Sequence, residues 1–188
     1  MRVCVCGGTN PATNKKFIDS AKQIGELFCD NDIELIWGGN SFGVLAEIHK
    51  VYIKRKKPNT LYLPKPYLDD LNGMTTDKVV ITETIGERQD AMSHNSDAIV
   101  FVPGGIGTVY EFWASVEALR SGEINAKLFL YNFEGFYDKQ IEFFDFINAN
   151  GFTKTGAGGS PYKVKPEELF TVVTTPQELM QQLLKMKK

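Results

Sequence analysis

The amino-acid sequence predicts an α/β protein in which a Rossmann-like, doubly wound parallel sheet forms a three-layer sandwich, with residues 1–188 as a single domain. Three observations predict this fold. Strand-like and helix-like segments alternate along almost the whole chain. The strand-like segments are continuous apolar runs, which is typical of strands covered by helices on both faces. Three of these runs end at a pair of glycines.

The first half of the chain opens with a short apolar run, "RVCVC" at residues 2–6, which predicts a buried strand. Residues 14–30 repeat apolar side chains at helical spacing and predict a helix. The run "IELIW" at 33–37 predicts the second strand, and residues 44–56 predict a second helix, with Pro58 beyond its end. Two more strand-like runs follow, "NTLYLP" at 59–64 and "KVVITE" at 78–83.

The second half continues the alternation. Residues 84–95 predict a short helix, "AIVFV" at 98–102 a strand, and residues 108–120 a helix. The last elements expected are strands at 127–132 and 168–173 and helices over 135–148 and 176–186. Residues 153–163 are rich in Gly, Ser and Thr and break the rhythm, which indicates either a surface linker or a lid that orders over a ligand.

Composition and charge are those of an ordinary soluble globular protein. Of 188 residues, 43% are hydrophobic and 23% charged, and the formal net charge is −2. This balance excludes a broad surface for nucleic acid or anionic membranes. The one dense basic cluster, "KRKK" at residues 54–57, is interpreted as the solvated end of a helix. No signal peptide precedes "MRVCVCGG", and no apolar run reaches the roughly 18–20 residues of a membrane span, so we expect a cytoplasmic protein.

The cysteines and histidines do not indicate a disulfide framework, a metal site or a catalytic role. The three cysteines are an odd number, and Cys4 and Cys6 lie in a strand-like run with no further Cys or His nearby. A disulfide framework or a metal site is therefore not expected, and the cysteines are interpreted as small buried hydrophobic residues. His49 and His94 are interpreted as ordinary residues of helix faces. We expect neither a metal nor a cofactor.

Glycine pairs mark the edge of the predicted sheet where a ligand can bind. Gly7–Gly8, Gly38–Gly39 and Gly104–Gly105 each follow a strand-like run. In an open parallel sheet the carboxyl ends of all strands meet at one edge, where ligands bind at the switch in strand order. Three glycine-rich loops at that edge let three backbones approach one ligand closely. Thr9 and Ser41 stand after the first two pairs and can add hydroxyl donors or serve as turn residues.

The ligand expected there carries a phosphate. Gly107–Thr108 is expected to open a helix, whose free N–H groups and positive dipole favour an anion, and Thr108 can cap the helix or donate to the phosphate. A Walker loop needs Lys where Val109 stands, and a dinucleotide fingerprint needs glycine where Tyr110 stands. No acidic residue closes the next strand, which ends at Asn132. A nucleoside monophosphate fits these residues better than a triphosphate or NAD.

A family resemblance agrees with this interpretation. The stretch "PGGIGTVYE" resembles the P-G-G-x-G-T-x-x-E signature of the "lonely guy" family, which are cytokinin riboside 5′-monophosphate phosphoribohydrolases long mislabelled as lysine decarboxylases. The stretch "ERQDAM" at residues 87–92 is similar to the family's second signature, E-R-K-x-x-M. The resemblance covers most of the chain, and it is more specific for the superfamily than for the substrate.

The resemblance implies hydrolysis of the N-glycosidic bond of a nucleoside monophosphate, AMP or a related one, to free base and ribose 5-phosphate. Arg88 and Glu111 match the family's catalytic arginine and glutamate. It also implies a homodimer or an assembly of dimers. The residues expected to bind phosphate or nucleotide are Gly8, Thr9, Gly39, Asn40, Gly104, Gly105, Gly107 and Thr108, with Gln89 and Met92 in the substrate pocket.

The residues support this chemistry independently of the family. Thr108 and Glu111 are three positions apart and share a helix face, so a phosphate at the helix start and a carboxylate one turn along would bracket a ribose. That carboxylate can stabilise the cationic sugar and orient water. The same two residues also read as a capping box. Arg88 can hold phosphate or the leaving base, or form a surface salt bridge.

Departures from the family keep a second function open. Gln89 stands where the family has Lys, Ile85–Gly86 stands for Met-His, and Asn40 replaces a commoner glycine. The alternative is a non-catalytic nucleotide or cofactor carrier of the same fold, as in molybdenum-cofactor carrier proteins, which look like relatives. A lysine decarboxylase is disfavoured because neither motif contains a lysine for pyridoxal phosphate. Phe112 and Trp113, beside Glu111, can serve a dimer interface or be buried within the chain.

Overall fold

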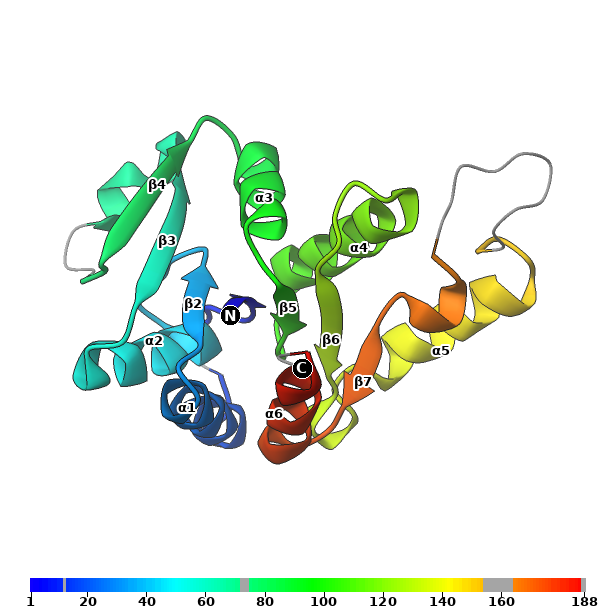
Figure 1. Ribbon diagram of the computed structural model, residues 1–188, viewed down its shortest axis with the longest axis horizontal. Helices are drawn as coiled ribbons and strands as arrows, with labels where there is room; N and C mark the ends of the chain where they lie inside the picture. Colours follow the sequence, from blue (N-terminus) through cyan, green and yellow to red (C-terminus); the bar gives the residue numbers. More distant parts are fainter. Residues whose placement is uncertain (12, 72–74, 154–163, 187–188) are drawn as a thin grey trace.

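The computed structural model describes residues 1–11, 13–71, 75–153 and 164–186. In these residues seven strands form one sheet in the order β4-β3-β2-β1-β5-β6-β7, and every neighbouring pair is parallel (Figure 1). The strands are β1 (Arg2–Cys6), β2 (Glu34–Trp37), β3 (Asn59–Pro64), β4 (Lys78–Thr82), β5 (Ala98–Phe101), β6 (Lys127–Tyr131) and β7 (Thr171–Val173). The α-helices are α1 (Lys15–Asp30), α2 (Gly43–Arg55), α3 (Ile85–His94), α4 (Ile106–Ser121), α5 (Asp138–Ala149) and α6 (Pro176–Lys185).

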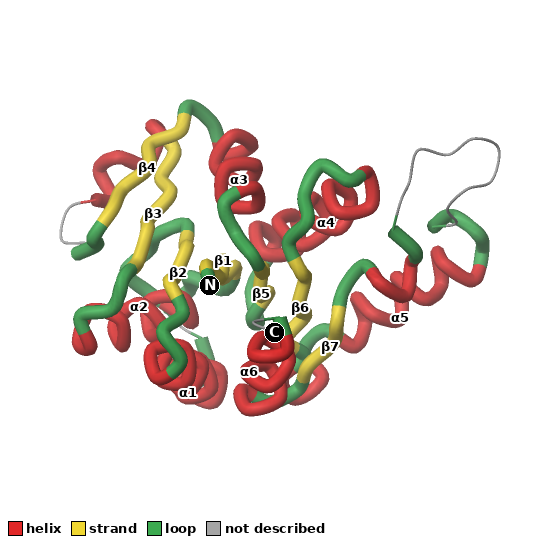
Figure 2. Tube along the Cα trace, viewed as in Figure 1, coloured by secondary structure: helices red, strands yellow, loops and turns green. Residues whose placement is uncertain are grey.

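Helices cover the two faces of the sheet, which confirms the predicted doubly wound three-layer fold. Helices α1, α2 and α6 pack on one face, and α3, α4 and α5 pack on the other (Figure 2). Alternate residues of β1 point to opposite cores: Val3 and Val5 join the first, Cys4 and Cys6 the second. Burial on both faces explains why the central strands are continuous apolar runs, whereas edge strand β4 leaves Val79 and Ile81 exposed. No helix of the described residues is long and apolar enough to cross a membrane.

Helix starts follow local capping chemistry, with one departure from the prediction. Asn14, Thr84 and Thr175 cap α1, α3 and α6 through their side-chain oxygens. Helix α4, however, begins at Ile106, two residues before the predicted start, and its N-cap is Gly105, whose backbone is extended. The expectation that Gly107–Thr108 opens this helix is therefore wrong, and so is the capping-box interpretation of Thr108 and Glu111.

The carboxyl-terminal third differs from the prediction at two element boundaries. The helix expected from residue 135 begins at Asp138, because the Asn132 side chain accepts a hydrogen bond from the Tyr137 amide and Gly135 turns at φ 72°. The strand expected over 168–173 is confined to β7, because residues 166–168 form a 3₁₀ turn. The possible lid at 153–163 lies outside the described residues apart from Thr153, which is buried.

The basic cluster at residues 54–57 forms the end of α2, as predicted. Arg55 pairs with Asp30 at 2.6 Å and Lys57 with Asp32 at 2.5 Å, and Lys56 closes the helix in the left-handed conformation. These are partly exposed ion pairs between neighbouring turns and loops. They give the cluster a structural use that needs no anionic ligand.

The strand order places the topological switch between β1 and β5. The chain winds outward from β1 through β2, β3 and β4, and then returns to β5 on the other side. The Gly8 amide donates a hydrogen bond to the Pro103 carbonyl oxygen at 3.0 Å, and the Val44 amide donates to the Gly8 carbonyl oxygen at 2.8 Å. The three glycine-rich loops therefore converge on one edge, as predicted, and a ligand cleft is expected at that switch.

Candidate active site

A cleft of about 350 Å³ opens at this edge, between the loops after β1, β2 and β5, helix α3 and the first turns of α4. Most of the residues that sequence reasoning assigned to the site lie in its walls. They are Gly8, Thr9, Gly39, Arg88, Met92, Gly105, Gly107, Thr108 and Glu111. Asn40 contributes to a neighbouring cavity, whereas Gly104 and Gln89 form no part of the cleft wall.

The glycines of the loop after β5 have two different uses. A Cβ on Gly104 would lie 2.1 Å from Thr108 Oγ1 and 2.8 Å from the Gly8 amide nitrogen, so this glycine lets the loops after β1 and β5 pack together. A Cβ on Gly105 or Gly107 would meet nothing within 4 Å. These two glycines therefore leave open space beside the backbone, where a ligand can approach the start of α4.

The amino end of α4 offers backbone donors to an anion. Gly105 has no side chain with which to cap the helix, and the first intrahelical bond runs from the Val109 amide to the Gly105 carbonyl oxygen at 3.0 Å. The N–H groups of the first turn therefore have no partner within the helix. Ile106 and Gly107 both line the cleft, so these donors and the positive end of the helix dipole lie at its wall.

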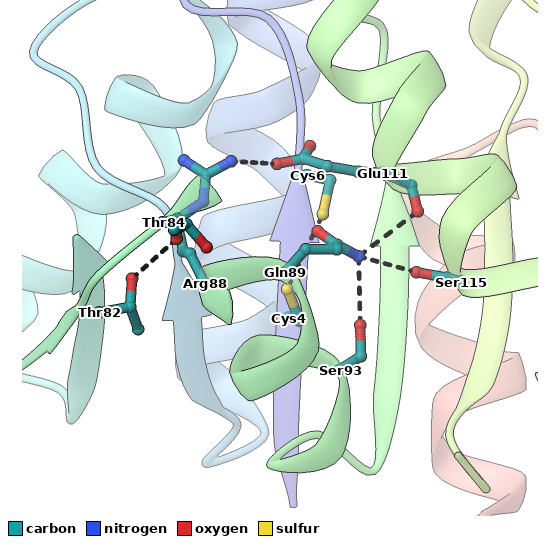
Figure 3. A network of polar contacts seen from close by, with 9 residues as sticks. All are labelled: Cys4, Cys6, Thr82, Thr84, Arg88, Gln89, Ser93, Glu111 and Ser115. Carbon is teal, nitrogen blue, oxygen red and sulfur yellow. Dashed lines mark hydrogen bonds and ion pairs between the residues drawn. The ribbon is translucent and has the colours of Figure 1, made fainter. Parts of the chain in front are cut away.

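Arg88 and Glu111 meet inside the cleft from different helices (Figure 3). Arg88 Nη2 donates a hydrogen bond to Glu111 Oε1 at 2.9 Å, and the two side chains are only 18% and 11% exposed. The pair is thus largely buried, not the surface salt bridge that the sequence left open. The guanidinium also lies against Gly38, where an added Cβ would come within 3.1 Å of Arg88 Nη1.

The surroundings of Glu111 shift its ionisation. Burial raises the pKa of this carboxyl group above the ordinary value, and the Arg88 charge and a hydrogen bond from Cys6 oppose that shift. A hydrogen bond with Cys4 and burial raise the pKa of the Cys6 thiol well above its usual range, so Cys6 keeps its proton. The two sulfur atoms are 3.8 Å apart and form no disulfide, as expected. Cys6 lines the cleft beneath Glu111 (Figure 3).

The Gln89 side chain, expected at the wall of the pocket, lies instead between α3 and α4 (Figure 3). Its Nε2 is 3.0 Å from Ser115 Oγ, 3.1 Å from Ser93 Oγ and 3.5 Å from the Glu111 carbonyl oxygen. Its Oε1 is buried without a hydrogen-bond partner in the described residues. Arg88 and Gln89 therefore join α3 to α4 through consecutive side chains, the first inside the cleft and the second behind it.

Asn40 holds an unusual backbone conformation beside the cleft. Its φ is 132°, in a region that favours glycine, and its side-chain oxygen accepts a hydrogen bond from the Phe42 amide at 2.9 Å. Gly39, just before it, has φ 83°. Strained backbone of this kind is concentrated at functional sites, because the surrounding structure must hold it in place.

Sequence reasoning missed several residues of the site. Cys6 lines the cleft, and Ser93 and Ser115 bind Gln89 behind it. Ser115 follows Glu111 by four positions and so shares its helix face, which is the one signal that could have found it. The histidines lie elsewhere: buried His49 stacks on Trp37 with ring centroids 3.9 Å apart, and His94 bonds the Asp90 carbonyl oxygen. In the described residues no group of three or more His, Cys, Asp and Glu side chains could hold a metal ion.

Comparison with known proteins gives one family and one fold. A family model described as "Possible lysine decarboxylase" matches residues 38–183. The chain is 30% identical over 154 residues to a probable cytokinin riboside 5′-monophosphate phosphoribohydrolase of Oryza sativa subsp. japonica, covering 81% of this chain and 69% of the relative. It is 26% identical over 152 residues to a cytokinin riboside 5′-monophosphate phosphoribohydrolase of Arabidopsis thaliana, covering 80% and 71%.

Solved structures of the same fold are more distant in sequence. The molybdenum cofactor carrier protein of Chlamydomonas reinhardtii superposes with a TM-score of 0.71 at 19% identity, over 99% of this chain and 97% of that one. The molybdenum cofactor binding protein of Rippkaea orientalis gives a TM-score of 0.69 at 15% identity, over 100% and 97%. At these identities the likeness establishes the arrangement of the elements and nothing about the ligand.

Proposed function

We propose a function from one premise: the chain belongs to the family described as possible lysine decarboxylase, the "lonely guy" family, whose relatives reported above are named phosphoribohydrolases. The proposed function is nucleoside 5′-monophosphate phosphoribohydrolase, which hydrolyses the N-glycosidic bond to free base and ribose 5-phosphate. The observation that carries it is the buried Arg88–Glu111 pair, which lies in the same cleft as a glycine-lined helix start that has no side-chain cap.

The phosphate binds at the first turn of α4 in this proposal. Gly105 and Gly107 leave room for it, and the backbone N–H groups of that turn donate to its oxygens. Thr9, on the facing loop, lines the same cleft and adds a hydroxyl donor. Thr108 is buried, and its hydroxyl packs against Gly104, so its contribution is the backbone N–H.

The sugar then lies beside Glu111, one turn further along α4. As the C1′–N bond breaks, its electron pair goes to the base nitrogen and positive charge develops on the ribose. The Glu111 carboxylate stabilises that charge and accepts a proton from water, whose oxygen bonds to C1′. The proton ends on the departing base, and the products are free base and ribose 5-phosphate.

Arg88 has two tasks in this mechanism. Its charge opposes the effect of burial on the pKa of Glu111 and so keeps more of the carboxylate ionised. A single hydrogen bond joins the two side chains, and Arg88 Nε is buried without a partner in the described residues. Donors therefore remain on the guanidinium for the substrate, where they can stabilise negative charge on the leaving base.

The first experiment is a panel of nucleoside 5′-monophosphates, with free base and ribose 5-phosphate measured as products. The proposal expects both products in equal amounts from at least one nucleotide. It also expects no release of base from the corresponding nucleosides at the same concentration, since they lack the phosphate. Absence of base release across purine and pyrimidine nucleotides would contradict the enzymatic assignment.

The residues of the cleft also bear on two alternative functions, lysine decarboxylation and the carrier role. Lysine decarboxylation is disfavoured because no lysine is among the described residues that line it. A carrier that binds a nucleotide or cofactor without turnover is favoured by one observation: Glu111 is already engaged by Arg88, and its pKa is raised, both of which weaken it as a free carboxylate. Tight nucleotide binding without base release is the result expected of a carrier.

We also propose that the protein is a homodimer. The support is the family resemblance, which implies a dimer. Phe112 cannot contribute to a dimer interface, because it is 1% exposed and packs edge-to-face on Phe101 and Phe170. Trp113 packs against Phe144 within the chain. The apolar side chains that remain exposed on this side of the molecule are others, namely Ile106, Val109 and Tyr110 on α4 and Phe143 and Phe146 on α5.

A further inference from the structure

A smaller cavity of about 170 Å³ adjoins the cleft. The two spaces share four wall residues, Thr9, Gly38, Gly39 and Arg88. The residues that line the smaller cavity and not the cleft are Asn40, Leu63, Pro64 and Tyr67, from the loop after β2, the end of β3 and the 3₁₀ segment Lys65–Leu71.

We propose that this cavity is the subsite for the nucleobase and that it selects a flat, uncharged base without a bulky substituent. The assignment rests on the proposed function and deepens it. If the phosphate lies at Gly105–Thr108 and C1′ beside Glu111, the base must extend away from the phosphate. The cavity adjoins the cleft at Arg88, which lines both spaces and contacts Glu111.

The walls of the cavity suit an aromatic ring. Leu63 and Pro64 are buried apolar residues at the carboxyl end of β3. Tyr67 is 45% exposed and makes no ring contact with another aromatic side chain of the described residues, so its face is available for stacking. Bases stack on aromatic side chains with little dependence on their identity, because every base has a π-face.

Polar groups at the rim can read the base edge. Hydrogen bonding of Asn40 Oδ1 to the Phe42 amide fixes the side-chain amide and leaves its NH₂ group as a donor. Arg88 is the one ionisable side chain other than Tyr67 among the described residues that line this cavity. The Nε of this guanidinium is buried without a hydrogen-bond partner in the described residues.

The volume limits the size of the base. A dry cavity of roughly 150 Å³ is enough to hold benzene, so a cavity of about 170 Å³ has the scale of one small aromatic ring system. An isoprenoid chain on the exocyclic nitrogen of adenine would need additional room. The substrates expected are therefore 5′-monophosphates of unsubstituted bases, with AMP as the probe.

The test compares AMP with ribose 5-phosphate, which lacks the base. Binding of both is measured by calorimetry in the Glu111→Gln protein, where slow turnover leaves the complex intact. Tyr67→Ala is expected to weaken AMP about 5- to 150-fold, the range for losing one stacking ring, and to leave ribose 5-phosphate unchanged. Tyr67→Phe keeps the ring and should bind AMP like its parent. Tyr110→Ala removes a tyrosine of similar exposure that lines neither space, and should change nothing.

The outcomes separate the subsite from the catalytic proposal. Equal affinity of the Tyr67→Ala protein and its parent for AMP would overturn the subsite, even if the wild type released base. Selective loss of AMP binding, with no base release by the wild type, would support the subsite and reject the hydrolase. Unchanged binding of ribose 5-phosphate shows that the variant is folded. In the wild type, kcat/KM for N6-isopentenyl-AMP should be at least about tenfold below that for AMP, and an equal or higher value would overturn the size limit.

Discussion

Arg88 on α3 donates a single 2.9 Å hydrogen bond to Glu111 on α4, although the two helices are separated in the chain by strand β5. Both side chains are largely buried, and the guanidinium lies against the backbone of Gly38. A buried ion pair is expensive to maintain unless it is well hydrogen-bonded, and it contributes little to stability. Its position in a cleft with a perturbed carboxyl group therefore points to chemistry rather than to folding.

Glu111→Gln is expected to reduce catalysis while leaving binding nearly intact. The amide keeps the shape and a hydrogen-bond acceptor but loses the charge that stabilises the cationic sugar. Loss of one preorganised electrostatic group costs roughly 10²–10³ in kcat. Single-turnover base release at saturating nucleotide measures it. Glu117→Gln is the matched control, because Glu117 lies on the same helix and pairs with Arg120 outside the cleft. A rate for Glu111→Gln within about threefold of wild type, far from the loss of an electrostatic group, would remove Glu111 from the mechanism.

The pH dependence of kcat/KM should show the raised pKa of Glu111. The carboxylate is the active form, so kcat/KM falls as pH drops through that pKa. This acidic side of the pH profile, the acid limb, should lie at a higher pH than an ordinary glutamate would give. Arg88→Ala removes a charge that lowers the pKa and should displace the limb further upward. An acid limb in Arg88→Ala at or below that of wild type would contradict this electrostatic role.

The same shift has a consequence for stability. The pKa of Glu111 is higher in the folded protein than in the unfolded chain, so its contribution to stability is present below the unfolded pKa and is lost as pH rises through the folded pKa. Glu111→Gln removes this loss. As pH rises from acid to neutral, the Tm of the variant should therefore increase relative to the Tm of the wild type. A difference that stays constant over this range would show that burial does not penalise the charged carboxyl group.

Gln89→Lys should move the acid limb of the kcat/KM profile to lower pH, while α3 and α4 stay packed together. Three acceptors surround Gln89 Nε2, which carries two hydrogens, whereas an ammonium group has three donors and no acceptor to leave unpaired. The added positive charge beside Glu111 favours its ionised form. Gln89→Leu is the comparison: it leaves buried hydroxyls without their donor and should lower the free energy of unfolding by about 1–3 kcal/mol. If Gln89→Lys destabilises the protein more than Gln89→Leu does, the network does not accept a cation.

Gly104 and Gly107 should respond in opposite ways to alanine. A methyl group on Gly104 would collide with Thr108 Oγ1 and the Gly8 backbone, and such overpacking costs about 1–3 kcal/mol of stability. A methyl group on Gly107 meets no protein atom and favours the helix, so stability should be unchanged or raised by up to about 1 kcal/mol. Affinity for AMP and for ribose 5-phosphate should fall in Gly107→Ala, since the methyl group occupies the proposed phosphate space. Unchanged affinity for both would place the phosphate elsewhere.

Light scattering at micromolar concentration is expected to give a mass twice that of the 21.1 kDa chain. The reason is the homodimer proposed above, together with the exposed apolar side chains of α4 and α5, among them Ile106 at 91% and Phe146 at 63% exposure. Phe146→Asp tests whether that surface is the contact and should yield monomers. A monomeric wild type would overturn the dimer, whereas a dimeric Phe146→Asp protein would move the contact to another face.

Much of the fold was predictable because burial leaves a strong pattern. Strands covered on both faces must be apolar throughout, so "RVCVC" and "AIVFV" could be placed from hydrophobicity alone. The order of the strands could not, because nothing in an apolar run states which neighbour it pairs with. The start of α4 was misplaced by two residues for a different reason: hydroxyl residues are the commoner caps, and here the extended backbone of Gly105 caps the helix without a side chain.

The site was predictable where a motif fixed the residue and unpredictable where side-chain direction mattered. Arg88 and Glu111 came from motifs, and they do meet. Gln89 is adjacent to Arg88, but successive residues of a helix point about 100° apart, so one reaches the cleft and the other the space behind it. Cys6 and Tyr67 belong to no motif, and they enter the site through strand alternation and a 3₁₀ segment respectively.

The closeness of Arg88 and Glu111 in the chain has a consequence for how the protein folds. They are 23 residues apart, within the unit formed by α3, β5 and α4. The hydrogen bond between Gly8 and Pro103, which joins the loops after β1 and β5, connects residues 95 positions apart. Because short loops close at lower entropic cost, we expect the α3–β5–α4 unit to become ordered before the amino-terminal loop docks on it. Substitutions that loosen this unit should then slow folding, and those in the Gly8 loop should mainly speed unfolding.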